Sequence, residues 1–343
     1  MSESLRAIPP YFHAAYTREV LPRPTTRDWA RHTFLFCVTA LTSTIAGLLL
    51  ATRGNFPEPT LPENLRWFQY LPHIPAYYAT QVKLLLQHGW AHPELIAQGV
   101  LFAICLLAIL TAHEFGHYLA CRYYNVDSTL PYFLPAPPLF LAGTFGAFIK
   151  IRSPIPSRRA LFDIGVAGPI AGFVVAVPVA LIGLLTAQTA PPIEPGQLGL
   201  EFHNSLLWHI LARVLNVQLA NMDGNPFYYA AWIGLLVTSL NLMPVGQLDG
   251  GHASFSLFGI QVHKWLGRAA FIFVALCTAF GWLYYGSPSG FLYTILLAFM
   301  LRVRHPEVYD QQPLGRTRLY VAAFTLLILL LSFLPVPITI LNN

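Results

Sequence analysis

The stretch HEFGH at residues 113–117 decides how the rest of the chain is interpreted. It follows an uncharged apolar run, Leu95–Ala112, which is long enough for most of a membrane-spanning helix. Residues four apart lie on one face of a helix, so His113 and His117 can present two imidazoles to one ion. Glu114 is adjacent and can reach a water molecule on that ion. Because ionisable groups are costly in hydrocarbon, this cluster predicts a functional site.

The composition predicts an integral membrane protein. Hydrophobic residues make up 55% of the 343 residues and charged residues only 10%, whereas soluble domains contain about 25% charged residues. The net charge of +5 does not require a nucleic-acid partner, and we expect none, since membrane proteins collect Lys and Arg in cytoplasmic loops. No C-x-x-C pair is present, so we expect neither a disulfide framework nor a cysteine zinc site.

Apolar runs predict an all-α polytopic membrane protein with about seven transmembrane helices and one short membrane-associated β-strand or hairpin. A cytoplasmic tail, 1–32, precedes the first run. The expected spans are Thr33–Ala51, Leu95–Cys121, Ile164–Thr189, Phe227–Leu248, two short helices broken at 287–290 within Ala269–Leu301, and Leu319–Leu341. In the third run, Gly168 and Gly172 are interpreted as a small-residue face for helix packing.

The positions of Lys and Arg set the expected orientation. With the N-terminus in the cytoplasm, the inner loops are 1–32, 122–160, 249–268 and 302–318. These loops contain 5, 5, 2 and 4 of the 20 Lys and Arg residues, which is 16 in total. This arrangement obeys the positive-inside rule and places the carboxyl terminus outside.

A catalytic zinc ion takes three protein ligands and keeps one position for water. Under this orientation, the run that contains His113 and the run that Asp249 directly follows both pass from outside to inside, so both residues fall near the cytoplasmic end. Asp249 is therefore the expected third ligand. Asp163 opens the third run from the same side and is the alternative, although we expect it to cap that helix.

The two motifs together resemble the site-two protease family of intramembrane zinc metalloproteases. That family pairs H-E-x-x-H with N-x-x-P-x-P-x-L-D-G, and residues 241–250 of this chain read NLMPVGQLDG. Gly246 stands where the pattern often has its second proline. The run 143–172 is also similar to the family's segment after the first motif. The similarity covers about residues 95–260.

The resemblance looks closest to the branch shared by bacteria and plant chloroplasts. Many other members carry a PDZ domain before the fourth span, and the loop 190–226 is too short for one. We expect residues 33–94 to hold the first transmembrane helix and an outer loop, 95–260 the intramembrane metalloprotease core, and 261–343 the C-terminal transmembrane helices. The expected location is the bacterial plasma (inner) membrane.

The resemblance implies one zinc ion per chain, bound by His113, His117 and Asp249. It also implies a zinc metalloendopeptidase that cuts within or next to transmembrane segments, as in regulated intramembrane proteolysis. Glu114 would be the general base. By the same resemblance, Asn241 is expected to orient the substrate or stabilise the oxyanion. An interhelical hydrogen bond is the alternative for Asn241.

Residues 143–152 (GTFGAFIKIR) predict a strand or hairpin, since β-branched and aromatic residues follow glycines. A transmembrane substrate hides its carbonyls in its own helix and must unwind before attack. Gly143, Thr144, Phe145 and Gly146 are therefore the expected substrate-binding residues, on a strand edge that pairs with the unwound segment. A loop that only plugs the cavity is the alternative.

Two other functions stay open. A metal transporter or channel also places His and Asp in spans, but it needs no general base such as Glu114. A structural scaffold would close its zinc site with four protein ligands, and three can be named. His88 and His92 are also four apart, but Gly89 and Pro93 disturb that pattern. The expected partners are transmembrane substrates and the lipid bilayer, and the sequence is compatible with a single chain or a homodimer.

Overall fold

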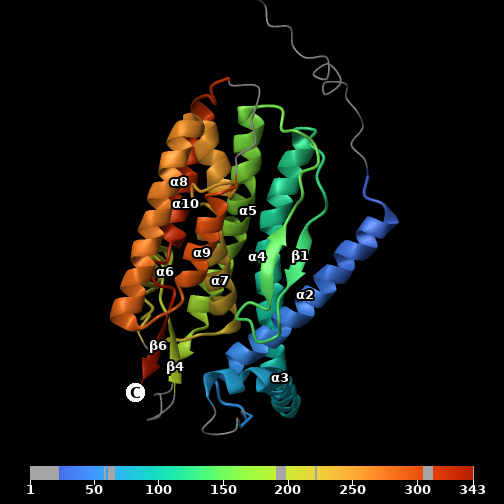
Figure 1. The fold of residues 1–343 in the computed structure, drawn as a ribbon, viewed down its shortest axis with the longest axis vertical. Helices are drawn as coiled ribbons and strands as arrows, with labels where there is room; N and C mark the ends of the chain where they lie inside the picture. The colour runs from blue at the N-terminus through green and yellow to red at the C-terminus, as the bar shows by residue number, and fades with distance from the viewer. Residues whose placement is uncertain are drawn as a thin grey trace, which may run out of the picture.

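The protein is mostly helical (Figure 1). The computed structural model describes residues 23–57, 59–60, 66–190, 198–220, 222–303 and 312–342. Its helices are α2 (Thr26–Thr52), α3 (Ile74–Ala91), α4 (Pro93–Tyr123), α5 (Arg158–Leu185), α6 (Leu206–Leu215), α7 (Pro226–Asn241), α8 (Asp249–Tyr285), α9 (Phe291–Met300) and α10 (Arg316–Ser332). In Figure 1, α4 and α5 stand in the middle, α8 and α10 lie to one side, and α2 crosses obliquely on the other.

In the described part of the chain, six short strands form three antiparallel pairs. They are β1 (Tyr132–Pro135) with β2 (Thr144–Phe148), β3 (Gln188–Thr189) with β5 (Met222–Asp223), and β4 (Leu198–Phe202) with β6 (Ile338–Asn342). The β1–β2 hairpin lies between α2 and α4 (Figure 1). The expectation of a strand within 143–152 is therefore confirmed.

Among the described residues, four helices, α2, α4, α5 and α8, are long and apolar enough to cross a membrane. They support an integral membrane protein. The expectation of about seven transmembrane helices is not confirmed. α7 has 16 residues and α10 has 17, so both are shorter than the apolar runs that predicted them.

The fourth expected span ends earlier than predicted. α7 stops at Asn241, because Pro244 has no backbone N–H and restricts Met243 before it. The chain turns and starts α8 at Asp249, so residues 249–268 are helical and the expectation of a loop there is wrong. α8 bends at Gly259, whose φ of 78° is non-helical. The expected break at 287–290 does separate α8 from α9.

The start of α2 corrects the expected tail. The helix begins at Thr26, inside the range 1–32, because Thr25 and Asp28 form a capping box. The Asp28 N–H donates to Thr25 Oγ1 at 3.2 Å, and the Thr25 N–H donates to Asp28 Oδ2 at 2.8 Å. Such a box satisfies backbone donors that a helix start leaves unpaired. Residues 1–22 of the expected tail lie outside the described residues.

The last expected span is also too long. α10 ends at Ser332, and residues 338–342 form β6 instead of a helix. Pro335 and Pro337 lack the N–H that a helix needs and favour extended backbone before them. β6 pairs with β4, which lies in the expected outer loop 190–226.

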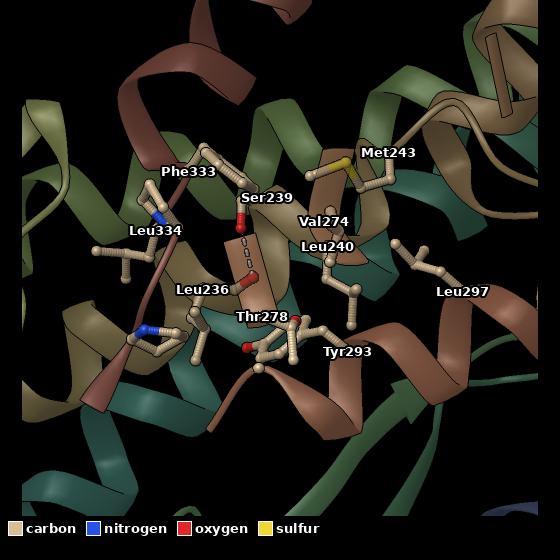
Figure 2. A pocket seen from close by; sticks show the side chains of 13 residues that line it. Leu236, Ser239, Leu240, Met243, Val274, Thr278, Tyr293, Leu297, Phe333 and Leu334 are labelled. Carbon is tan, nitrogen blue, oxygen red and sulfur yellow. Dashed lines mark hydrogen bonds between the residues drawn. The ribbon is translucent and has the colours of Figure 1, made fainter. Parts of the chain in front are cut away.

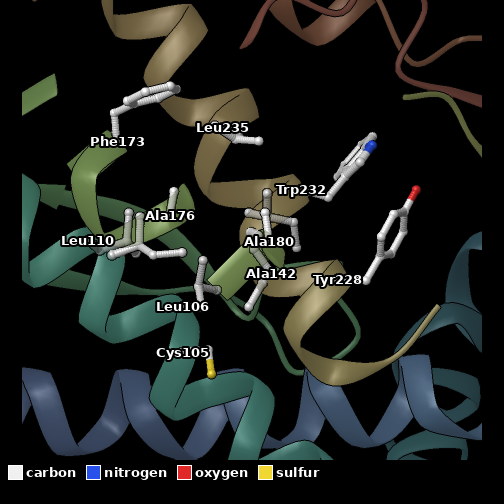
Figure 3. Close-up of a cluster of buried hydrophobic side chains, with 14 of the residues drawn as sticks. Cys105, Leu106, Leu110, Ala142, Phe173, Ala176, Ala180, Tyr228, Trp232 and Leu235 are labelled. Atoms are coloured by element: carbon white, nitrogen blue, oxygen red, sulfur yellow. The ribbon is translucent and has the colours of Figure 1, made fainter. Parts of the chain in front are cut away.

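The main apolar core lies between α4, α5 and α7 (Figure 3). Small side chains of α5 face larger ones from the two neighbours, which brings the three helices close together. The cluster includes Leu106 and Leu110 of α4, Ala176 and Ala180 of α5, and Trp232 and Leu235 of α7.

The crossing of α2 and α4 depends on glycine. A Cβ on Gly99 would lie 2.6 Å from the Thr44 carbonyl oxygen and 2.9 Å from the Leu48 nitrogen. These neighbours are backbone atoms and cannot move without separating the helices. Gly99→Val is therefore expected to lower the free energy of unfolding by about 1–3 kcal/mol, the cost of overpacking. Thermal unfolding of purified protein in detergent measures this, with Val100→Ala at an exposed position as the control. Equal melting temperatures for the two variants would contradict the close crossing.

Candidate metal centre

Two helices bring three ligand-type side chains together. His113 and His117 come from α4, and Asp249 comes from the first turn of α8. Within the part of the chain that the structure describes, they form the one group of three such residues whose ligand atoms all lie within 4.8 Å of one another. The two Nε2 atoms are 3.1 Å apart. Asp249 Oδ2 lies 3.2 Å from His113 Nε2 and 3.3 Å from His117 Nε2.

The protonation of one imidazole follows from its partner. His117 Nδ1 lies 2.7 Å from the Ile164 carbonyl oxygen of α5. A carbonyl only accepts, so Nδ1 carries the proton and donates it. The neutral ring then turns the Nε2 lone pair toward His113 and Asp249. Two imidazole nitrogens and a carboxylate are ligands that a catalytic zinc site uses, so these side chains fit zinc.

The glycines of α5 make room for the two imidazoles. A Cβ on Gly168 would overlap the His117 ring, and one on Gly172 would lie 3.2 Å from His113 Cβ. On the α4 side, a Cβ on Gly116 would lie 2.5 Å from the Ala167 carbonyl oxygen. The two glycines of α5 thus pack against the ligands themselves. The sequence pattern predicted only a small-residue face for helix packing. The sequence does contain a signal for this contact, because Gly168 and Gly172 are four residues apart, as are His113 and His117.

Glycines also place Asp249. A Cβ on Gly250 would overlap the Leu242 carbonyl oxygen, and one on Gly251 would overlap that of Gly246. The turn between α7 and α8 can therefore fold directly onto the first turn of α8. Gly246 has a φ of 54°, in the left-handed region. Proline is fixed near −65° and could not occupy this position, which explains the departure from the second proline of the family pattern.

Glu114 and Asn241 lie beside the three ligands. Glu114 is 5% exposed and does not belong to the group of three. It lies on α4, which also contacts β2. Asn241 is the last residue of α7, and its Nδ2 lies 3.3 Å from His113 Nε2. Both side chains can therefore act on a molecule bound at the cluster.

The four expected substrate-binding residues divide into two pairs. Gly143, with a φ of 65°, lies against α2, where a Cβ would overlap the Thr42 carbonyl oxygen. Thr144 is buried and donates from Oγ1 to the Leu134 carbonyl at 2.8 Å. Phe145 is 62% exposed, and Gly146 has open space beside it. The first pair supports the hairpin, and the second is accessible.

Asp163 does not join the candidate centre. Arg318 of α10 binds its carboxylate with Nε and Nη2, at 2.9 and 2.7 Å, and the Tyr124 hydroxyl donates to the same carboxylate. Burial and the neighbouring carboxylate raise the pKa of Tyr124, which keeps this donor protonated. The expectation that Asp163 caps a helix is wrong, since α5 begins earlier and Ser157 is its N-cap.

The other histidine pair lies at the exposed junction of α3 and α4. The rings of His88 and His92 are 4.6 Å apart, and His92 Nδ1 lies 3.2 Å from Glu94 Oε1. These side chains do not form a group of three ligands around one point among the described residues.

A small apolar cavity lies elsewhere, between α7, α8, α9 and residues 333–337 (Figure 2). Ser239 and Thr278 contribute hydroxyl groups to its lining, and Tyr293 contributes a phenol. None of the three candidate ligands lines it.

The contact between Gly168 and His117 yields a graded test. Gly168→Ala is expected to displace the imidazole and abolish zinc binding, because the added methyl group sits on a rigid helix. Gly172→Ala adds the same group at an ordinary to tight distance, so we expect a loss of less than about tenfold in zinc affinity. Zinc titration with a competing chelator measures both variants. Full affinity in Gly168→Ala would show that the two helices are further apart.

Comparison with known proteins adds independent information. The sequence profile of Peptidase family M50 matches residues 101–281. The chain is 32% identical over 241 residues to the "Probable zinc metalloprotease EGY1, chloroplastic" of Arabidopsis thaliana, which covers 67% of this chain and 42% of that protein. It is 30% identical over 216 residues to the corresponding EGY2 protein of Oryza sativa subsp. indica, covering 61% of this chain and 37% of that protein.

The chain thus spans about two fifths of the length of these curated relatives. A solved structure, the site-2 protease from Methanocaldococcus jannaschii, aligns with a TM-score of 0.35 and 16% identity, covering 62% of this chain and 82% of that chain. A similarity at that level carries no argument about the fold. Because the matched profile extends over more than half of the sequence, the chain belongs to Peptidase family M50.

Proposed function

We propose that this protein is an intramembrane zinc metalloendopeptidase that cuts peptide bonds within or next to transmembrane segments of membrane proteins. The observation that carries the proposal is the convergence of His113, His117 and Asp249 next to Glu114. Two imidazoles and one carboxylate supply three ligands and leave a position for water, which distinguishes a catalytic zinc site from a structural one. Membership in a peptidase family supports the same chemistry.

Several residues of this chain would have separate roles in peptide-bond hydrolysis. Zinc, when bound, acidifies a water molecule and polarises the peptide carbonyl. Glu114 takes the proton of the attacking water and delivers it to the leaving amine. The Asn241 amide lies 3.3 Å from His113 Nε2, and if that nitrogen held zinc the amide would be available to the substrate or its oxyanion. The hydrogen bond to Ile164 holds the His117 ring in the ligating tautomer.

We propose that the substrate segment binds along β2. Within the described residues, β2 pairs with β1 and with no second strand, and we propose that its other edge pairs with the substrate. Phe145 and Gly146 are accessible on this strand, and β2 contacts α4, the helix that carries Glu114. A peptide bond presented along this edge would reach the general base in an extended conformation.

The two other functions explain fewer observations. A metal transporter or channel gives no role to the buried Glu114 and is not favoured by the family. A closed structural zinc site would need a fourth protein ligand, and the cluster of described residues has three.

The finer topology is also a proposal. We propose seven spans with a cytoplasmic N-terminus in the bacterial plasma membrane, acting as one chain or a homodimer, with 95–260 as the catalytic core. The basic residues of 1–32, 122–160 and 302–318, which are 14 of the 20 Lys and Arg residues, support this orientation. The pairing of β4 with β6 supports a common side for the loop 190–226 and the carboxyl end.

A reporter enzyme tests the orientation. Alkaline phosphatase fused after residue 343 is active only outside the cytoplasm, so we expect activity in a bacterial host. The same reporter inserted between Arg152 and Ser153 is expected to be inactive. The reverse pattern would overturn the orientation and leave the chemistry untouched.

Substitutions at the centre test the chemistry. Glu114→Gln keeps the shape of the side chain and loses the base, so it should retain zinc and cut a panel of single-span membrane peptides at least about 100-fold more slowly. Asp249→Ala should lose both zinc and cleavage. Zinc content and cleavage are measured on the same reconstituted samples. Cleavage by Glu114→Gln at the parent rate would refute the proposed mechanism.

A further inference from the structure

Helix α2 makes direct hydrogen bonds to the backbone of the β1–β2 hairpin. The Thr42 hydroxyl donates to the Gly143 carbonyl at 2.6 Å, and the Ser43 hydroxyl donates to the Ala142 carbonyl at 3.1 Å. Both carbonyls lie just before β2. At the other end of the hairpin, His32 Nδ1 lies 2.9 Å from the Pro131 carbonyl oxygen, just before β1.

These polar side chains share one face of α2. His32 and Ser43 are separated by about three helical turns, so they project in nearly the same direction. Between them, Phe36 packs edge-on against Phe133 with ring centroids 5.0 Å apart, and the His32 ring lies 4.1 Å from that of Tyr132. The contact therefore follows the hairpin from its opening to the residues before β2.

Anchoring an irregular segment needs such bonds in an apolar environment. A backbone carbonyl without a partner is costly in hydrocarbon, and non-helical backbone at that depth must be satisfied by protein or water. Thr44 of the same helix shows the ordinary arrangement, in which the hydroxyl donates to the Ala40 carbonyl of its own helix at 2.8 Å. The Thr42 hydroxyl also lies 3.2 and 3.1 Å from the Val38 and Thr39 carbonyls of its own helix, but its shortest bond, at 2.6 Å, goes to the hairpin. The Ser43 hydroxyl donates to the hairpin.

The hairpin also contacts the helix that carries the candidate general base. α4, with Glu114, contacts β2. The hairpin thus lies between α2 and α4 (Figure 1). The position of the hairpin along the axis of α4 therefore depends on the hydrogen bonds that α2 makes with the two ends of the hairpin.

We propose that His32, Thr42 and Ser43 are positioning residues that set the register of β2 against Glu114, and so decide which substrate peptide bond is cut. This inference rests on the proposed function of β2 as the substrate-pairing strand. A displacement on the order of 1 Å between reacting groups can cost about 100-fold in rate. A hairpin that slides along α4 would therefore change both the rate and the bond that is cut.

The test compares two variants of α2. Thr42→Val combined with Ser43→Ala removes both hydroxyl donors at nearly constant volume, and Thr44→Val removes a hydroxyl that does not touch the hairpin. The substrate is a synthetic peptide with one transmembrane segment, reconstituted with the protein in phosphatidylcholine–phosphatidylglycerol vesicles. Zinc content, kcat/KM and, by mass spectrometry, the position of the cut are measured for each.

We expect the double variant to keep its zinc, to lose about tenfold in kcat/KM for two lost hydrogen bonds, and to cut at shifted or additional positions. Thr44→Val should match the parent in all three measurements. A purely structural role for the hydroxyls would lower the amount of active protein and leave the cut position unchanged. A double variant that cuts at the parent position would overturn the proposal.

A crosslinking arm separates this inference from the proposed function. Phe145→Cys is introduced with Cys37→Ser, which removes an exposed thiol, and with Glu114→Gln to prevent cleavage. Single cysteines are scanned through the peptide, and disulfide formation maps the register. We expect one preferred register with the parent α2 and a shifted or broadened one in the double variant. An unchanged register refutes the positioning role, whereas a failure of the parent to cut any peptide refutes the protease function alone.

Discussion

The close approach of α5 to α4 is the constraint on which the candidate metal centre depends. Gly168 and Gly172 leave the space that the imidazoles of His117 and His113 occupy. The Ile164 carbonyl then fixes the tautomer of one imidazole. The packing of α4 against α5 therefore also orients the imidazoles of His113 and His117. A side chain at either glycine would occupy ligand space, so the stability of the helix pair and the geometry of the centre cannot vary independently.

The remaining parts of the site are irregular segments held in an apolar bundle. The turn between α7 and α8 folds tightly because Gly246, Gly250 and Gly251 have no side chains in the way, and this brings Asp249 to the histidines. The β1–β2 hairpin is held by hydroxyl and imidazole groups of α2. Such segments tolerate an apolar environment only where their backbone groups find partners. The centre thus combines regular helices, which set its depth, with the α7–α8 turn and the β1–β2 hairpin, which complete it.

The sequence predicted the elements that leave a local signal. Helical spacing placed His113 and His117 on one face, and charge counting brought Asp249 to a similar depth, where the structure has them in contact. The glycines before β2 predicted a strand. The sequence could not predict interactions between segments far apart in the chain, such as the pairing of β4 with β6 or the contacts of α2 with the hairpin. Apolar runs also continue past the ends of helices, because hydrophobicity alone does not show where a proline or a turn interrupts the backbone hydrogen bonds of a helix.

X-ray absorption at the zinc K-edge of the purified protein reports which atoms surround the ion. We expect a coordination shell of nitrogen and oxygen only, with the outer-shell signals of two imidazoles. One imidazole should disappear in His117→Ala. A shell containing sulfur, or a spectrum unchanged by His117→Ala, would contradict a centre formed by His113, His117 and Asp249.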